Sequence, residues 1–158
     1  MGVLNGKRGL IMGVANEKSA AWGIAAMAAE HGADLAFTYQ IEGFRKRLAP
    51  LASSVGSDFL IPCDVAEETA AQKTFAAIRT RWDALDFVVH AIGFSDKSEL
   101  KGPYYNTTRQ NFEQTMLISA FSFTEIAAEA RKIMPEGGSL LTLSYLGGVR
   151  TTPNYNVM

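Results

Sequence analysis

Two tyrosines near the end of the sequence are the side chains best suited to chemistry. Tyr145 and Tyr155 come after an apolar segment with the character of a buried strand. An open α/β sheet places its reacting groups just past the carboxyl ends of its strands. A tyrosine hydroxyl can hold or donate a proton at neutral pH, which suits reactions at a carbonyl or an enolate. The alternative is that both tyrosines are half-buried rim residues with hydrated hydroxyls.

The turn after the first apolar segment is a second candidate. Residues Gly9–Met12 are predicted to form a strand buried on both faces, and Gly13 ends it, with Ser19 and Gly23 further on. A terminal glycine allows the main chain to approach a pyrophosphate, and a serine can cap the next helix and bind phosphate. Gly23 is expected to let that helix lie close to the sheet. The spacing is not G-x-G-x-x-G, so an ordinary βα turn without a ligand is the alternative.

Polar residues after the second and third predicted strands suggest an adenosine site. The second strand ends in Thr38-Tyr39-Gln40, without the acidic residue that would bind both ribose hydroxyls. Gln40 is neutral and neither repels nor strongly attracts a 2′-phosphate, so NADH is preferred over NADPH. Asp64 follows the third strand, where its carboxylate either meets the adenine edge or caps a helix expected to begin at Glu67.

The elements that must position these residues alternate along the chain. The predicted strands span 9–12, 34–39, 58–61, 86–92 and 140–144, and the predicted helices span 20–31, 42–51, 67–82 and 109–134. Alternating strands and helices predict an α/β fold with a parallel sheet covered on both faces. Right-handed crossovers make it a doubly wound, Rossmann-like sheet with strand order 3-2-1-4-5. The ligand crevice then lies at the ends of strands one and four.

Composition narrows the functional classes. The 158 residues predict one domain, and a composition of 47% hydrophobic and 20% charged residues is typical of a soluble globular protein. A net charge of −1 gives no electrostatic basis for binding nucleic acid or an anionic membrane. The single cysteine, Cys63, forms no internal disulfide and lies in no metal-ligand spacing. With no membrane-length apolar run or signal peptide, a cytoplasmic location is expected.

Several other residues have a simpler structural interpretation. His90 follows three apolar residues in a central strand and is predicted to be a hydrogen-bonded core histidine rather than a base. Trp22, Trp82, Phe112 and Phe121 occupy helical positions and are predicted to be core residues.

Taken together, the motifs resemble a known family: the bacterial NADH-dependent enoyl-[acyl-carrier-protein] reductases of type II fatty acid synthesis. These enzymes are a divergent branch of the short-chain dehydrogenase/reductase superfamily. The resemblance extends over the whole chain. Other short-chain reductases carry a T-G-x-x-x-G-x-G loop and a tyrosine and lysine three residues apart. The segments that carry the resemblance are the Gly13…Ser19…Gly23 loop, Cys63-Asp64-Val65, Ala91-Ile92-Gly93-Phe94, Leu143-Ser144-Tyr145 and Pro153-Asn154-Tyr155-Asn156-Val157-Met158.

The resemblance implies a role for individual residues. Tyr145 would be a positioning tyrosine, and Tyr155 would hydrogen-bond the substrate carbonyl. Phe94 and Met158 would border the acyl pocket. The family usually has isoleucine where this chain has Ala20. The implied cofactor-binding residues are Gly13, Ala15, Ser19, Ala20, Gln40, Asp64, Val65, Ile92 and Gly93.

The resemblance also implies ligands and partners. The cofactor would be NADH, and the substrate an enoyl thioester on acyl carrier protein. The intact protein would be a homotetramer, with no metal, nucleic acid or membrane partner.

The sequence departs from the family at its end. The family lysine that grips the nicotinamide ribose lies beyond Met158, so residues 1–158 are expected to be a single dinucleotide-binding domain that is incomplete at its C terminus. A natural truncation, which we would expect to be inactive, is the competing explanation. Two other functions stay open: another short-chain reductase, such as a 3-ketoacyl reductase, and a non-catalytic nucleotide-binding module.

Overall fold

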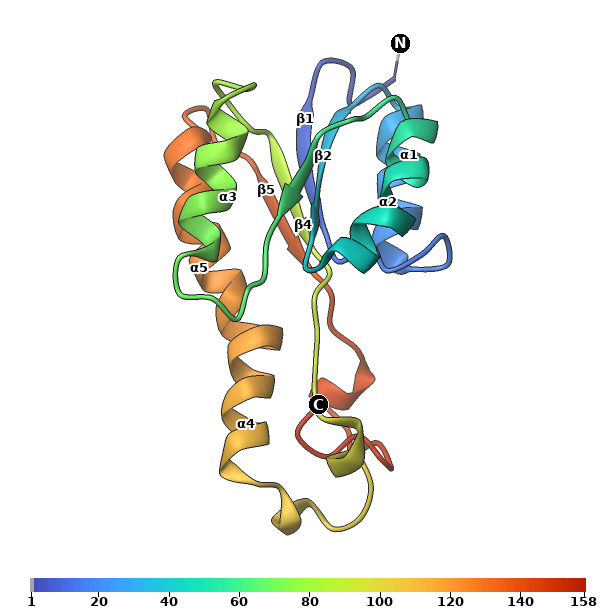
Figure 1. Cartoon of the computed structure of the whole chain (residues 1–158), viewed down its shortest axis with the longest axis vertical. Coiled ribbons are helices and arrows are strands. Elements are labelled where there is room, and N and C mark those ends of the chain that lie inside the picture. The colour runs from blue at the N-terminus through green and yellow to red at the C-terminus, as the bar shows by residue number, and fades with distance from the viewer. Residues whose placement is uncertain (1) are drawn as a thin grey trace.

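A five-stranded parallel sheet forms the centre of the protein. The computed structural model describes residues 2–158, and the strand order is β3-β2-β1-β4-β5 (Figure 1). This confirms the predicted doubly wound topology. The strands are β1 (Arg8–Met12), β2 (Asp34–Tyr39), β3 (Leu60–Pro62), β4 (Phe87–His90) and β5 (Ser139–Thr142). The α-helices are α1 (Ala20–Glu30), α2 (Glu42–Ser54), α3 (Ala70–Arg79), α4 (Arg109–Met116) and α5 (Ser122–Ala130).

Helices cover both faces of the sheet. Helices α1 and α2 lie on one face, and α3 and α5 lie on the other (Figure 1). Leu10 and Met12 of β1 belong to the core beneath α3 and α5, whereas Ile11 belongs to the core beneath α1 and α2. All three are 0% exposed, as predicted for a strand buried on both faces. Burial of each such side chain stabilises the fold by about 1.5–3 kcal/mol.

The helix boundaries follow local hydrogen bonding. Helix α1 begins after Ser19, as predicted, because the Ser19 Oγ accepts the main-chain N–H of Trp22. Helix α3 begins at Ala70 rather than at the predicted residue 67. The chain first makes a turn in which Asp64 Oδ1 accepts the Ala66 N–H at 3.0 Å, so Asp64 caps this turn and not the helix.

The long helix predicted over 109–134 is four consecutive helical segments. Between α4 and α5, the five residues Leu117–Phe121 form a π-helical turn, and Arg131–Ile133 end the run as a 3₁₀ turn. Helix α4 projects beyond the carboxyl ends of the strands and runs beside the loop after β4 and the C-terminal segment (Figure 1). Short 3₁₀ turns in those segments span Lys97–Glu99, Tyr104–Asn106 and Leu146–Gly148.

Two aromatic residues of this helical run are exposed. Phe112 is 44% exposed and Phe121 is 53% exposed, so the prediction that they are core residues is wrong. Phe112 lies on the part of the helical run that extends past the sheet. Trp22 and Trp82 each pack against a core cluster, as predicted. None of the helices within residues 2–158 is long and apolar enough to cross a membrane.

Strand β5 has the apolar residues of a buried strand, but within residues 2–158 it is the exposed edge of the sheet. Within residues 2–158 it pairs only with β4, and Leu140 and Leu141 are 38% and 42% exposed. A groove of about 810 Å³ separates α1 from β4 and β5, with Ile24, Met27 and Leu141 among its lining residues. A Cβ on Gly23, which also lines the groove, would meet nothing within 4 Å. The prediction that Gly23 provides close helix–sheet packing is therefore wrong.

Candidate functional site

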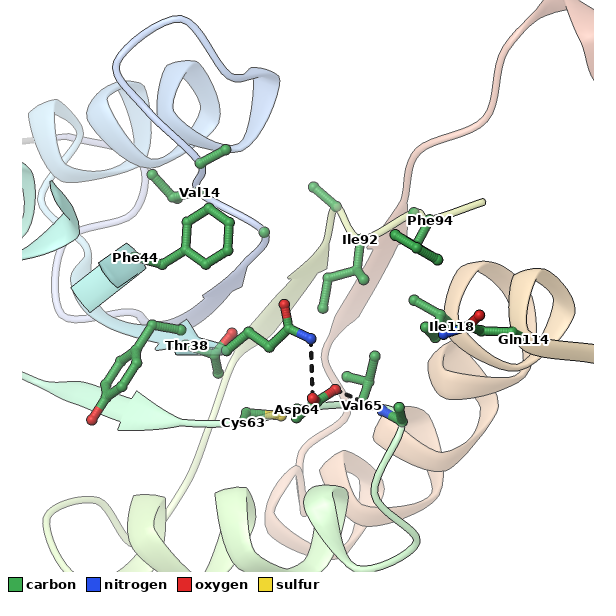
Figure 2. A pocket seen from close by; sticks show the side chains of 17 residues that line it. Val14, Thr38, Phe44, Cys63, Asp64, Val65, Ile92, Phe94, Gln114 and Ile118 are labelled. Carbon is green, nitrogen blue, oxygen red and sulfur yellow. Dashed lines mark hydrogen bonds between the residues drawn. The ribbon is translucent and has the colours of Figure 1, made fainter. Parts of the chain in front are cut away.

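A cleft of about 400 Å³ opens at the carboxyl ends of β1 and β4, where the strand order reverses (Figure 2). Ligands of open α/β proteins bind at this position. Among residues 2–158, no three His, Cys, Asp or Glu side chains are grouped so that they could hold a metal ion, in the cleft or elsewhere. Eight of the predicted site residues line it: Gly13, Ala15, Gln40, Asp64, Val65, Ile92, Gly93 and Phe94.

The turn after β1 lines the cleft through Gly13, Val14 and Ala15. Gly13 has a φ of 91°, a conformation that favours glycine. A Cβ at this position would collide with the main-chain oxygen of Ala91, at the end of the neighbouring strand β4. Only glycine therefore lets the β1 and β4 ends approach this closely.

Ser19 and Ala20 lie at the start of α1 but do not line the cleft. The Ser19 hydroxyl donates to the main-chain oxygen of Asn16 at 2.7 Å while it caps the helix. The N terminus of α1 carries partial positive charge, which favours an anion such as phosphate. Of Gly13, Ala15, Ser19 and Ala20, which were predicted to bind the cofactor, Gly13 and Ala15 line the cleft.

The ends of β2 and β3 form the polar end of the cleft. The Gln40 side-chain nitrogen donates to Asp64 Oδ2 at 3.0 Å, the bond drawn to Asp64 in Figure 2. Because Asp64 also accepts the Ala66 N–H, its carboxylate is fixed from two sides. Phe44, from the first turn of α2, lies beside Val14 at this end.

The opposite wall is mostly apolar. Ile92 and Phe94 follow β4 and face Ile118 and Gln114 from the α4 side (Figure 2). Phe94 is 44% exposed. The Met158 Cε lies 3.3 Å from the point that a Cβ on Gly93 would occupy. The two residues predicted to border an acyl pocket thus lie on the same side of the cleft.

The two tyrosines lie together, outside the set of cleft-lining residues. Their ring centroids are 5.4 Å apart at an interplanar angle of 48°, and each residue is 44% exposed. The segment that carries Tyr155 is held to the loop after β4, because the Asn156 Nδ2 donates to the main-chain oxygen of Glu99 at 2.8 Å. This bond and the approach of Met158 to Gly93 place the C-terminal segment that carries Tyr155 beside the loop after β4.

Two buried titratable groups lie at or beneath the cleft, and both are held neutral. Burial raises the pKa of the Cys63 thiol, which lines the cleft floor. Burial lowers the pKa of His90, which is 0% exposed. A neutral thiol is a poor nucleophile. A neutral imidazole that is fully enclosed offers neither a charge nor a contact to a ligand. Neither group is therefore suited to act as a nucleophile or an acid.

His90 is a core histidine, as predicted. Its Nε2 lies 2.8 Å from the Ser122 Oγ, and that hydroxyl donates to the main-chain oxygen of Ile118 at 2.7 Å. Because the hydroxyl hydrogen is used in this way, Nε2 carries the proton and donates to Ser122. The Nδ1 has no hydrogen-bond partner among the residues that the structure describes.

Sequence reasoning missed several lining residues. Phe44 had a detectable signal, since it is the apolar residue in a polar first turn that follows a strand end. Gln114 and Ile118 had none, because their helix is far from the glycine turn in sequence and its direction cannot be derived from periodicity. Thr38 and Cys63 were placed at strand ends without a ligand role.

The fold and the cleft define a class: the chain is a Rossmann-type α/β protein. Solved structures share this fold closely. The crystal structure of FabI from Candidatus Liberibacter asiaticus superimposes with a TM-score of 0.98 at 58% identity, covering 100% of this chain and 61% of that chain. An enoyl-(acyl-carrier-protein) reductase from Anaplasma phagocytophilum in complex with NAD gives a TM-score of 0.95 at 49% identity, covering 99% and 60%.

The family follows from the sequence comparisons. The family model described as enoyl-(acyl carrier protein) reductase matches residues 13–158, and the chain belongs to that family. Enoyl-[acyl-carrier-protein] reductase [NADH] 2 of Rhizobium meliloti (strain 1021) is 62% identical over 157 residues, which are 99% of this chain and 59% of the relative. The Rickettsia bellii (strain RML369-C) enzyme FabI is 47% identical, with coverage of 99% and 60%. The chain thus spans about three fifths of the length of these relatives.

Proposed function

We propose that the intact protein reduces the trans-2 double bond of enoyl thioesters on acyl carrier protein, with NADH as the cofactor. The observation that carries the proposal is the convergence of eight family-matched residues, from four separate segments of the chain, on one cleft. A relative that bears this activity in its name is 62% identical to the chain.

The residues present fit a dinucleotide. One end of the cleft offers the hydrogen-bonded pair Gln40 and Asp64, which suits an adenosine. The middle offers the glycine turn after β1, where the main chain at Gly13 and Ala15 can approach a pyrophosphate closely. The other end is apolar around Ile92 and Phe94, which suits a nicotinamide beside an acyl chain. Gln40 carries no charge, so NADH is preferred over NADPH.

The tyrosine pair supplies the polar chemistry. Bound NADH would provide the hydride that is added to the β carbon of the substrate. Negative charge then develops on the thioester oxygen, and a hydroxyl aimed at that oxygen stabilises the transition state more than the ground state. We assign this hydroxyl to Tyr155, with Tyr145 positioning its ring from 5.4 Å away. Phe94 and Met158 would border the acyl chain.

The test is oxidation of NADH by a trans-2-enoyl thioester in the intact protein. Tyr155→Phe should lower kcat by about 100-fold or more, the usual effect of removing one donor to a developing oxyanion, with NADH binding unchanged. Tyr105→Phe is the matched control, because Tyr105 is 85% exposed on the loop after β4. Unchanged turnover in Tyr155→Phe contradicts the assigned role.

The same assay separates the alternatives. Preferential reduction of a 3-ketoacyl thioester would identify another kind of short-chain reductase. NADH binding without thioester-dependent oxidation would identify a non-catalytic nucleotide-binding module.

We further infer that the intact protein is a cytoplasmic homotetramer. The support is membership of the family described as enoyl-(acyl carrier protein) reductase, for which the sequence resemblance implies a cytoplasmic homotetramer. Light scattering on the intact protein measures the assembly, and a monomer would contradict it.

A further inference from the structure

One serine holds both main-chain groups of Phe94. The Phe94 N–H donates to the Ser119 Oγ at 3.0 Å, and the same hydroxyl donates to the Phe94 carbonyl oxygen at 3.1 Å. Ser119 lies on the π-helical turn Leu117–Phe121. Phe94 itself is 44% exposed, so packing alone does not fix its ring. The placement of the ring depends on the main chain that Ser119 holds.

The residues that follow Phe94 are held by the same helical run. The Asp96 N–H donates to Asn111 Oδ1 at 2.8 Å, and the Ser95 Oγ lies 3.2 Å from Asn111 Nδ2 and 3.0 Å from Thr115 Oγ1. Asn111 and Thr115 are only 4% and 2% exposed. Buried polar side chains of this kind cost stability unless they are hydrogen-bonded, so these bonds specify one arrangement.

The π-helical turn is anchored to the sheet as well. Ser122 follows the turn directly, and its Oγ accepts from His90 at the end of β4. π-helical turns are rare and often occur at functional sites. Two connections meet at this turn. Ser122 bonds to β4, and Ser119 bonds to the loop after β4. The helical run is therefore hydrogen-bonded to both ends of the segment 90–96, at His90 and at Phe94 to Asp96.

We propose that Ser119 is a positioning residue that sets the affinity for the acyl substrate by fixing Phe94 at the wall of the cleft. The inference rests on the proposed function, because it takes the Phe94 side of the cleft as the acyl side. Ser119 does not act on the reacting atoms. It acts through the main chain of Phe94, and the His90–Ser122 bond holds its turn against β4.

The test compares Ser119→Ala with Ser119→Thr, which keeps a hydroxyl. Ser54→Ala is the matched control, because the Ser54 hydroxyl also donates to a main-chain oxygen, at 2.7 Å, but lies on α2 away from the cleft. The first readout is amide hydrogen exchange over residues 92–96. The second is the KM for the enoyl thioester and the KM for NADH, measured separately in the intact protein.

Ser119→Ala should raise the KM for the enoyl thioester about tenfold, the equivalent of losing one to two hydrogen bonds. The KM for NADH should stay within about twofold, since the lost bonds do not involve the polar end of the cleft. Exchange of the Phe94 amide should become faster. Ser119→Thr should keep the KM for the enoyl thioester and the exchange rate of the Phe94 amide at their wild-type values. Ser54→Ala should also leave both quantities unchanged.

Two results overturn the proposal: unchanged exchange at Phe94 in Ser119→Ala, or a parallel rise of both KM values, which indicates general loss of structure. A wild-type protein that does not oxidise NADH with an enoyl thioester contradicts the proposed function instead. In that case exchange alone decides the role of Ser119: faster exchange at Phe94 supports the hold on the main chain, and unchanged exchange refutes it.

Discussion

The two walls of the cleft are built in different ways. The cofactor-side wall consists of strand ends and the turn after β1, so the sheet itself fixes Gly13, Gln40 and Asp64. The substrate-side wall consists of the loop after β4, which is held by side chains such as Asn111 and Ser119. The first wall is specified mainly by backbone geometry at the ends of neighbouring strands. The second depends on side-chain hydrogen bonds between a loop and the helical run, so single side-chain changes should perturb it selectively.

The largest effect is expected from Gly13→Ala, in the cofactor-side wall. Alanine at this position must adopt a positive φ, which costs about 1–2 kcal/mol, and its Cβ collides with the main chain of Ala91. We therefore expect that both folding and NADH binding fail. Thermal unfolding and NADH fluorescence measure this. Gly23→Ala is the control, since its Cβ meets nothing within 4 Å and should stabilise α1 by about 0.5–1 kcal/mol. A folded, NADH-binding Gly13→Ala protein would contradict the argument.

The contrast between the walls also explains what the sequence could predict. Strand alternation and apolar runs determined the fold class and the strand order, since both follow from local patterning. Gly13, Gln40 and Asp64 were predictable because a cleft at the ends of parallel strands follows from topology. Their placement needed no knowledge of any side chain elsewhere.

The substrate-side wall could not be predicted for a physical reason. Ser119 and Thr115 look like ordinary polar residues of a helix, and their partners lie in a loop without a regular pattern. The π-helical turn inserts a change of phase that apolar periodicity does not reveal. A strand pattern indicates an apolar face at Leu141 but not what covers that face, and within residues 2–158 this side chain is 42% exposed.

The next largest effect is expected from Asn156→Ala, which removes the bond to Glu99 that holds the C-terminal segment. Tyr155 should lose its fixed position, and kcat should fall about tenfold, while NADH affinity stays unchanged. Steady-state kinetics and NADH titration measure the two effects. Asn154→Gly is the control, because Asn154 already has a positive φ of 61°. Weaker NADH binding in Asn156→Ala would show that the two walls are not independent.

A smaller effect is expected from acidification, through His90. Burial lowers the pKa of this imidazole below its ordinary value of 6.5. Below pH 6.5 the unfolded chain takes up a proton that the folded protein does not, so stability is complete above that pH and decreases as the pH falls toward the folded pKa. The slope is at most about 1.4 kcal/mol per pH unit for one group. Amide exchange should therefore accelerate first around Ser122.

Denaturant unfolding between neutral and mildly acidic pH measures this dependence. His90→Gln should flatten the slope even if it lowers stability overall. Equal acid sensitivity in wild type and His90→Gln would contradict the assignment.

The smallest effect is expected from Gln40→Leu. The Gln40 nitrogen is used in the bond to Asp64, so its side-chain oxygen is the atom available to accept from a ligand. Loss of that one acceptor should weaken NADH binding about threefold. Reduced nicotinamide mononucleotide lacks the adenosine half, so its affinity should not change, and kcat at saturating NADH should also be unaffected. Gln72→Leu, on the exposed side of α3, is the matched control. If NADH and reduced nicotinamide mononucleotide lost the same binding affinity, Gln40 would lie outside the adenosine end of the cleft. Gln40 would then not belong to the cofactor-side wall as defined above.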